Sequence, residues 1–132
     1  MLLIDTYVAP SVIPEAGLGL YCRSFVPAGT VLWRYADGID VTLDALPTEP
    51  LWRSFVLKYA YRPIGSTSWV LCVDDARFMN HSDTPNTGET ADGGTYAPFD
   101  IPAGAELTCD YREFAEDPFG GWSAAKPEPA IP

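Results

Sequence analysis

Two short segments of the chain concentrate residue types that can do chemistry. Residues 77–86 (RFMNHSDTPN) are dense in Asn, His, Ser and Asp, and residues 106–111 (ELTCDY) place a carboxylate before a tyrosine. Asn, Asp, Ser and Thr side chains hydrogen-bond to nearby backbone groups, so the first segment alone predicts a turn that needs no ligand. Tyr111 alone predicts a strand tyrosine, because tyrosines are common in strands.

The adjacent His81 and Ser82 could also suggest a hydrolase. Neighbouring residues of a strand point to opposite faces, however, so the imidazole and the hydroxyl would seldom meet. No nucleophile elbow surrounds Ser82. The pair therefore gives little support to a serine nucleophile.

Together, and in this order, the two segments resemble signatures of the SET-domain family. Residues 77–86 match the family's RFxNHSCxPN signature, and residues 106–111 match its ELxxDY signature. Gly17, Leu18 and Gly19 supply the GxG that precedes both. Glycines mark any tight turn, so the weight rests on the two longer motifs, which are rich in uncommon residues. The resemblance runs from about residue 17 to residue 111.

The resemblance implies a fold and a cofactor. The SET-domain fold is mostly β, with short strands in small sheets, one or two short helices and a C-terminal segment threaded like a pseudoknot, which makes the two motifs neighbours. The implied cofactor is S-adenosylmethionine. The backbone of Gly17, Leu18 and Gly19 would approach its methionine end, where a missing Cβ allows close contact. Asn80 and His81 would hold its adenine and amino-acid portions.

The implied activity is that of a protein-lysine N-methyltransferase. Tyr111 matches the family's catalytic tyrosine, whose hydroxyl can orient the attacking amine and shape the field around the sulfonium. Tyr35 resembles the tyrosine of the family's EYxG element, with one extra residue before Gly38, and is a second candidate for catalysis and for the substrate channel. The alternative for Tyr35 is a ring in the core of a strand. Arg77 and Asn86 are expected to brace the threaded segment.

The sequence departs from many family members where they bind zinc. In those proteins a cysteine follows Asn-His-Ser and joins three later cysteines around the metal. Here that position is Asp83, and no cysteine follows Cys109, so we expect no metal site. Phe119 and Trp122, with Phe114, could close the cofactor site by folding over the adenine, or they could be plain packing residues.

Cys109 is a second departure. It stands two residues before Tyr111, where relatives carry a phenylalanine or tyrosine that influences how many methyl groups fit. A smaller side chain leaves more room in the substrate channel. Cys109 is therefore expected to line that channel and to favour multiple methylation over a single transfer.

Frequent proline and glycine, 13 and 11 residues of 132, divide the chain into short runs and predict brief strands joined by turns. Residues 18–25 and 31–35 are expected to form a hairpin around the turn at residues 26–29 (VPAG). The same turn chemistry recurs at residues 101–104 (IPAG), before a strand at residues 106–111.

One helix is expected after residue 48. Thr48 could cap it and Pro50 suits its first turn. Its apolar stripe consists of Leu51, Trp52, Phe55, Val56 and Tyr59. The β-rich run at residues 69–73 predicts a further strand.

Length and composition indicate a single domain over residues 1–132, with a core at about residues 14–114 and a closing segment and tail at residues 115–132. The first residues include no basic region and no long apolar run, so we expect neither a signal peptide nor a membrane span. The expected location is therefore the cytoplasm. Three cysteines without a CxxC pair argue against a disulfide framework. Cys22 and Cys72 are expected to be buried thiols.

The charge balance narrows the partners. Eight Lys and Arg against 18 Asp and Glu give a formal net charge of -10, which disfavours nucleic acid and anionic lipid. The expected partner is a lysine-containing protein or peptide of basic character, because an acidic surface attracts cations. One alternative is a catalytically inactive SET-like module that binds basic peptides. Another, a small β-rich structural protein, gives no reason for both long motifs to occur in order.

Overall fold

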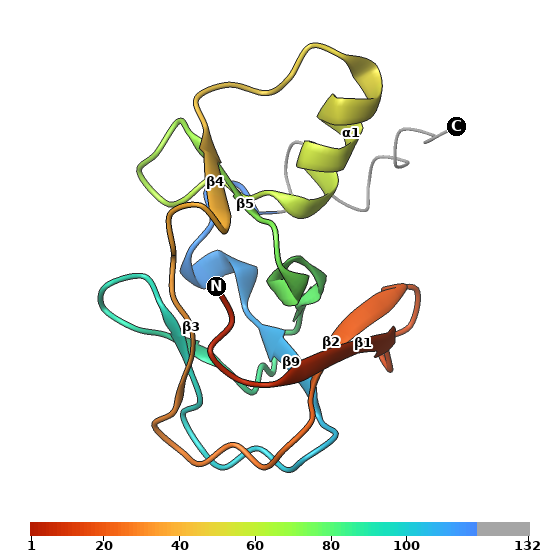
Figure 1. Ribbon diagram of the computed structural model, residues 1–132, viewed down its shortest axis with the longest axis vertical. Coiled ribbons are helices and arrows are strands. Elements are labelled where there is room, and N and C mark those ends of the chain that lie inside the picture. Colours follow the sequence, from red (N-terminus) through yellow and green to blue (C-terminus); the bar gives the residue numbers. More distant parts are fainter. Residues whose placement is uncertain (119–132) are drawn as a thin grey trace.

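A computed structural model describes residues 1–118 (Figure 1). Most of its elements are short strands: β1 Thr6–Pro10, β2 Leu18–Cys22, β3 Val31–Trp33, β4 Asp40–Leu43, β5 Trp69–Cys72, β6 Asn80–His81, β7 Gly88–Glu89, β8 Thr95–Tyr96 and β9 Glu106–Cys109. The helical elements are α1 Pro50–Tyr59 and the 3-10 helices η1 Asp75–Phe78 and η2 Tyr111–Glu113. The predicted class, mostly β with small sheets and short helices, is confirmed.

The strands form three small sheets, with the orders β1-β2-β9-β6, β3-β8-β7 and β4-β5. Neighbours are antiparallel except β6 and β9, which are parallel. The main core lies between the first two sheets and includes four fully buried side chains, Leu20, Leu32, Ile101 and Leu107. A second cluster around Val56 and Leu71 packs α1 against the β4-β5 sheet, at the top of Figure 1.

The hairpin predicted for residues 18–35 is wrong. β2 pairs with β1 and β9, whereas β3 pairs with β8. The connection at residues 23–30 is longer than a tight hairpin loop, so the chain can cross from one sheet to another. Its turn lies against the second turn of the same kind, because Val26 and Ile101 exchange backbone hydrogen bonds of 2.9 and 2.8 Å. The similar turns thus join two sheets at one corner.

The helix is close to its prediction, but its cap is different. The carboxylate of Glu49, not the hydroxyl of Thr48, accepts hydrogen bonds from the backbone N–H groups of Leu51 and Trp52, at 3.2 and 2.8 Å. Val56 is fully buried, whereas Leu51 and Trp52 are each 48% exposed. α1 covers one edge of the molecule, so only part of the predicted apolar stripe meets the core.

The two sequence motifs lie side by side through the parallel pairing of β6 with β9. Asn86 holds the segment after β6 in place: its side-chain amide donates to the carbonyl of Glu106 at 2.8 Å, and its side-chain oxygen accepts from the backbone N–H of Thr108 at 2.9 Å. The bracing role predicted for Asn86 is confirmed. Arg77 instead donates to the carbonyls of Val73 and Asp74, before the motif.

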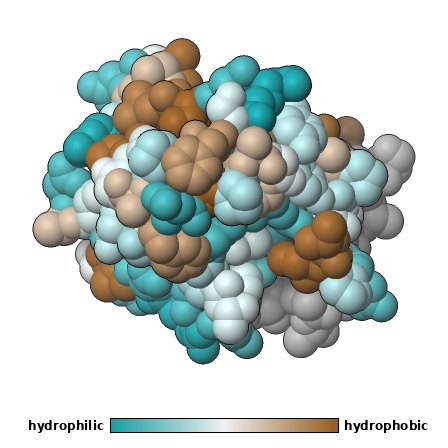
Figure 2. All heavy atoms as spheres, turned by 90° about the horizontal axis from the view of Figure 1, so that it is seen from below, coloured by the Kyte–Doolittle hydropathy of each residue, from teal (hydrophilic) through white to brown (hydrophobic). Residues whose placement is uncertain are grey.

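All three cysteines are free and buried, which confirms the prediction for Cys22 and Cys72. Among residues 1–118, no helix has the length and apolar character needed to cross a membrane. On the face shown in Figure 2, hydrophobic side chains gather in several separate places among hydrophilic ones.

Candidate active site

The GxG segment meets both long motifs at one point. Asn80, on β6, donates from its side-chain amide to the carbonyl of Leu18 at 2.9 Å and to the carboxylate of Glu106 at 3.1 Å. A Cβ added at Gly19 would lie 2.4 Å from that carboxylate and 3.4 Å from the Asn80 amide nitrogen. Gly17 has a φ of 75°, a conformation that favours glycine. The structure therefore brings Gly17, Leu18, Gly19 and Asn80 together.

Glu106 is the centre of this arrangement, although sequence reasoning gave it no role of its own. Besides Asn80, its carboxylate accepts hydrogen bonds from the Ser11 hydroxyl at 2.8 Å and from the backbone N–H of Val12 at 3.0 Å. The loop before the GxG segment is thereby tied to β9. The sequence signal that could have identified Glu106 was its position as the first residue of the ELxxDY motif.

His81 is held by both ring nitrogens. The backbone N–H of Tyr111 donates to Nδ1 at 3.1 Å, and Nε2 lies 2.9 Å from a carboxylate oxygen of Asp83. Because Nδ1 accepts, the ring proton belongs on Nε2, where it can donate to Asp83. The imidazole thus links the Asn-His segment to the start of η2.

Asp83 occupies the position of the zinc-binding cysteine in many relatives, and here it takes part in a polar network. Arg112 lies 3.2 Å from the Asp83 carboxylate and 2.8 Å from that of Asp110. Hydrogen bonding to Arg112 is the main cause that lowers the pKa of Asp110 to about 2. The Asp110 carboxylate is therefore ionised at neutral pH. Within residues 1–118, no group of three or more His, Cys, Asp or Glu side chains could hold a metal ion.

Tyr111 lies between the Asn-His segment and an aromatic cluster. Its hydroxyl donates to the carbonyl of Met79 at 2.8 Å, and its ring centre lies 5.3 Å from that of His81 and 5.9 Å from that of Phe114. Phe114 in turn meets Tyr61 edge to face at 5.0 Å. Burial raises the pKa of Tyr111, so the hydroxyl keeps its proton and acts as a donor at neutral pH.

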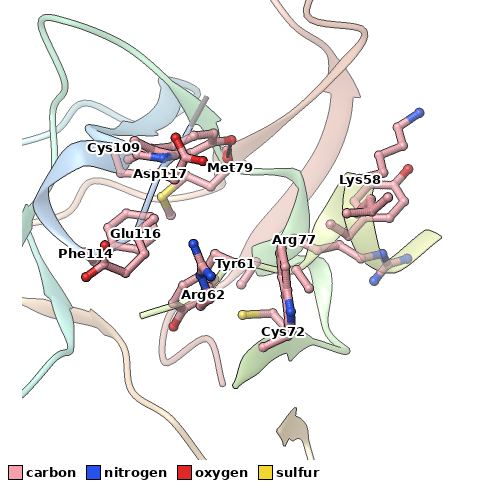
Figure 3. A pocket seen from close by; sticks show the side chains of 18 of the residues that line it. Lys58, Tyr61, Arg62, Cys72, Arg77, Met79, Cys109, Phe114, Glu116 and Asp117 are labelled. Carbon is pink, nitrogen blue, oxygen red and sulfur yellow. Dashed lines mark hydrogen bonds between the residues drawn. The ribbon is translucent and has the colours of Figure 1, made fainter. Parts of the chain in front are cut away.

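A cavity of about 360 Å³ opens beside Tyr111 (Figure 3). Cys109 lines it together with the aromatic side chains of Trp33, Tyr61 and Phe114. Burial raises the pKa of the Cys109 thiol, so the thiol is neutral and unsuited to act as a nucleophile. The structure thus places several aromatic side chains on the cavity wall next to Tyr111.

Other predicted residues are not brought to this cavity. Tyr35 is 43% exposed, its hydroxyl lies 2.9 Å from that of Thr42, and it does not line the cavity. Phe119 and Trp122 lie outside the described residues. Trp33 stands on the wall instead, and sequence reasoning missed it. No short sequence pattern marks Trp33, because the cavity wall is assembled from several elements and β3 is irregular between Val31 and Trp33.

Comparisons with known proteins agree with this geometry. The family model for the SET domain matches residues 17–112. No curated protein shows a significant match.

Solved structures resemble the chain at low identity. The Chaetomium thermophilum polycomb repressive complex 2, in an autoinhibited conformation bound to S-adenosylmethionine, matches with a TM-score of 0.61 and 18% identity over 86% of this chain and 16% of that chain. A Plasmodium falciparum protein described as a candidate histone methyltransferase matches with a TM-score of 0.54 and 18% identity over 81% of this chain and 96% of that chain. At such identities the likeness shows the fold, and the chain spans about a sixth of the length of the first of these proteins.

Proposed function

The chain belongs to the SET-domain family, and we propose that it transfers methyl groups from S-adenosylmethionine to lysine side chains of a protein substrate. The observation that carries this proposal is the position of Tyr111. Its hydroxyl is hydrogen-bonded to the Met79 carbonyl, directly before the Asn-His segment, and its ring lines the aromatic cavity. One side chain therefore joins the expected cofactor residues to a channel suited to a lysine.

The residues that would hold the cofactor are Gly17, Leu18, Gly19, Asn80 and His81. The test of fit is the crowding at Gly19, where any side chain would displace Glu106 and disturb Asn80. Such a glycine lets the Glu106 carboxylate pack directly against the backbone, where it holds the Asn80 amide in position for a ligand. When bound, S-adenosylmethionine supplies an electrophilic methyl group on a cationic sulfonium.

The cavity residues favour the neutral form of a lysine amine. Free lysine has a pKa of about 10.4, so removing its proton at pH 7 costs roughly 4–5 kcal/mol in water. Transfer into an aromatic cavity lowers the pKa of an amine, because burial disfavours its charged form. A neutral amine held there could accept the methyl group that bound S-adenosylmethionine would supply, with S-adenosylhomocysteine as the leaving group, and would then lose one proton to solvent.

Tyr111 orients the amine in this scheme and does not remove its proton. Its hydroxyl has a raised pKa and already donates to Met79, so a tyrosinate base is disfavoured. A fixed hydroxyl dipole next to the reacting atoms stabilises the transition state electrostatically. The small Cys109 side chain on the same wall leaves room for an amine that already carries methyl groups, which supports repeated transfer.

A direct assay tests the proposal. The protein is incubated with isotope-labelled S-adenosylmethionine and a pool of lysine-containing peptides, and the products are examined by mass spectrometry for mono-, di- and trimethyl-lysine. Labelled methyl-lysine is the expected result. Binding of cofactor and peptide without any transfer would instead identify a catalytically inactive SET-like module.

A further inference from the structure

The arginines that line the cavity differ in their ion-pair partners from the arginines that lie away from it. Away from the cavity, each arginine within residues 1–118 is paired with aspartate: Arg23 with Asp5, Arg34 with Asp92, and Arg112 with Asp83 and Asp110. Such pairing is expected in a chain with 18 acidic and 8 basic residues, because carboxylates are abundant everywhere.

The arginines that line the cavity depart from this pattern. Arg53, Arg62 and Arg77 all lie on its wall, and none of them forms an ion pair within the described part of the chain. In Figure 3, Arg62 lies in the middle of the view, between Phe114 on one side and Arg77 on the other. The cavity therefore combines an aromatic side with a cationic side.

Aromatic rings contact two of these guanidinium groups, and backbone carbonyls of Val73 and Asp74 also accept from Arg77. The Arg62 group lies 5.9 Å from the ring centre of Trp69, and the Arg77 group lies 4.5 Å from that of Phe78. Stacking positions a guanidinium and partly removes it from water while leaving the N–H groups at its edge to point elsewhere. Two arginines are thus held in place without neutralisation of their charge.

Several donors on this wall have no acceptor. The Nε atoms of Arg62 and Arg77 are buried and make no hydrogen bond. The indole nitrogen of Trp33 is also buried without a partner, and Trp33 is only 6% exposed. A buried donor without a partner costs about 1–3 kcal/mol, so the side chains of this wall are not fully satisfied by the described part of the chain.

The acidic residues of the cavity do not serve as acceptors for the arginine side chains. Glu116 and Asp117 line the cavity, but neither lies within ion-pair distance of Arg62. One oxygen of Glu116 accepts from the backbone N–H of Gly65 at 2.7 Å. In Figure 3, both acidic side chains lie on the side of Phe114 and Cys109, away from Arg77. The backbone N–H of Glu116 also donates to the Arg62 carbonyl at 2.7 Å, so Arg62 lies between the acidic side of the cavity and Arg77.

We propose that Arg62, supported by Arg53 and Arg77, binds a carboxylate of the protein substrate, so that the protein selects lysines that have an acidic residue close by. Arginine suits this role because its planar fork matches a carboxylate in two parallel hydrogen bonds. The acidic side of the cavity receives the cationic lysine as it approaches. This inference rests on the proposed function. The net charge suggested a basic substrate, whereas the inferred substrate carries an acidic residue close to the lysine that is methylated.

Peptide binding tests the inference without requiring turnover. The probes are two fluorescent peptides with a single lysine, flanked on both sides by glutamate in one and by glutamine in the other, measured by anisotropy in the presence of S-adenosylhomocysteine. The glutamate peptide should bind about tenfold more tightly, a preference that declines as salt screens the charges. Arg62→Gln should bring the ratio close to one, whereas Arg62→Lys should keep only part of it, because lysine retains the charge and loses the fork.

Arg23→Gln is the matched control. Arg23 is also stacked on an aromatic ring, at 5.0 Å from the ring centre of Tyr7, but it does not line the cavity. Its loss should leave the tenfold ratio unchanged. Circular dichroism checks that each variant is folded, and if Arg62→Gln does not fold, the exposed Arg53→Gln gives the ratio in its place, with a decrease expected.

Four outcomes would overturn the inference. They are equal binding of the two peptides, no measurable binding of either, a ratio that survives Arg62→Gln, and a loss of cofactor affinity in Arg62→Gln with the peptide ratio intact. The last outcome would assign the carboxylate to the cofactor. A preference for the glutamate peptide without any methyl transfer would uphold the inference and reject the proposed function.

Discussion

At the scale of single residues, the closest contacts of the site are those among Gly19, Glu106 and Asn80. The Glu106 carboxylate accepts from Asn80 and from the loop before the GxG segment, and it fills the space that a side chain at Gly19 would need. The second glycine of the GxG motif is therefore required by packing. Its backbone φ is not in the left-handed region that favours glycine.

Gly19→Ala should consequently weaken both the fold and cofactor binding. The new Cβ would lie 2.4 Å from a Glu106 oxygen, so the carboxylate must move and release the Asn80 amide. We expect a loss of about 1–3 kcal/mol in the free energy of unfolding, because buried polar groups lose their partners. Calorimetry should show at least tenfold weaker binding of S-adenosylmethionine.

Gly29→Ala is the control for this prediction. Gly29 has a φ of 87° with open space around it, so alanine there costs about 1–2 kcal/mol of backbone strain. Stability should fall, but cofactor affinity should not change. Equal cofactor affinity in Gly19→Ala and the natural protein would refute the role of Gly19.

Glu89 gives a prediction about pH. Burial, and next the nearby carboxylate of Glu113, raise the pKa of Glu89 from its ordinary 4.5 to about 7. Between these values the folded state keeps a proton that the unfolded state releases, so this group stabilises the fold at low pH and loses that contribution as pH rises through about 7. Glu89→Gln should therefore be more stable than the natural protein at pH 8.

Urea unfolding at pH 8 and at pH 4 measures this effect. The advantage of Glu89→Gln should shrink toward zero at pH 4, where both the folded and unfolded forms of the natural protein are mostly protonated at this position. A difference in stability that does not depend on pH would show that Glu89 does not titrate in this way.

At the scale of elements, the site depends on how β6 and the segment after it are attached to β9. The Asn86 side chain satisfies one carbonyl and one N–H of β9, at Glu106 and Thr108. These bonds keep the ELxxDY motif beside the Asn-His segment. Tyr111 follows directly, so its position depends on the same attachment.

Asn86→Ala should destabilise the protein by roughly 2–4 kcal/mol, because it leaves two backbone groups of β9 without a partner. Urea unfolding would measure this loss. Asn86→Asp keeps the acceptor for Thr108 and loses the donor to Glu106, so its cost should be smaller. An alanine variant as stable as the natural protein would mean that water replaces both bonds.

The elements that were predicted correctly are those with local signals. The helix at residues 50–59 follows from a proline and an apolar stripe, and the strand at residues 69–72 from a β-rich run. The hairpin was wrong because strand partners are chosen by the whole chain. Nothing within residues 18–35 shows that β2 would pair with β1 and β9.

In the candidate site, too, the residues that could be predicted are those with a local sequence signal. The motifs identified Asn80, His81 and Tyr111, and the structure brings them together. Trp33 and Arg62 were missed because a cavity wall is assembled from several elements, and no short pattern marks residues that meet only after folding. Tyr35, chosen from an imperfect local match, lies off that wall.

At the scale of the whole molecule, the net charge of the chain differs in sign from the charge of the arginines that line the cavity. The formal net charge of -10 predicts an acidic surface, whereas the cavity is lined by three arginines that form no ion pair within residues 1–118. Local charge acts at the short distances over which a substrate binds, because salt screens the rest within about 8–10 Å. Net charge is therefore a poor guide to the substrate of this protein.

Ligand binding gives a prediction for the whole chain. S-adenosylmethionine at a hundredfold excess over its dissociation constant should stabilise the protein by about 2.7 kcal/mol, since it binds the folded state alone. A thermal shift assay should show a rise of several degrees. A metal chelator should leave the melting temperature unchanged and elemental analysis should find no stoichiometric zinc. An unchanged melting temperature with cofactor, or one zinc per chain, would contradict the account.

The most direct test of the central claim is methyl transfer by Tyr111→Phe. Phenylalanine keeps the ring and removes only the hydroxyl, so the fold should lose about 1 kcal/mol, the worth of one hydrogen bond to Met79. Loss of one pre-oriented dipole beside the reacting atoms costs about 3–4 kcal/mol in the transition state, so labelled methyl transfer to lysine should fall roughly a hundredfold to a thousandfold. Cofactor affinity should stay within a few-fold, and Tyr35→Phe should transfer methyl groups at close to the natural rate. Near-normal transfer by Tyr111→Phe with the cofactor bound would make Tyr111 a packing residue and contradict the proposed mechanism.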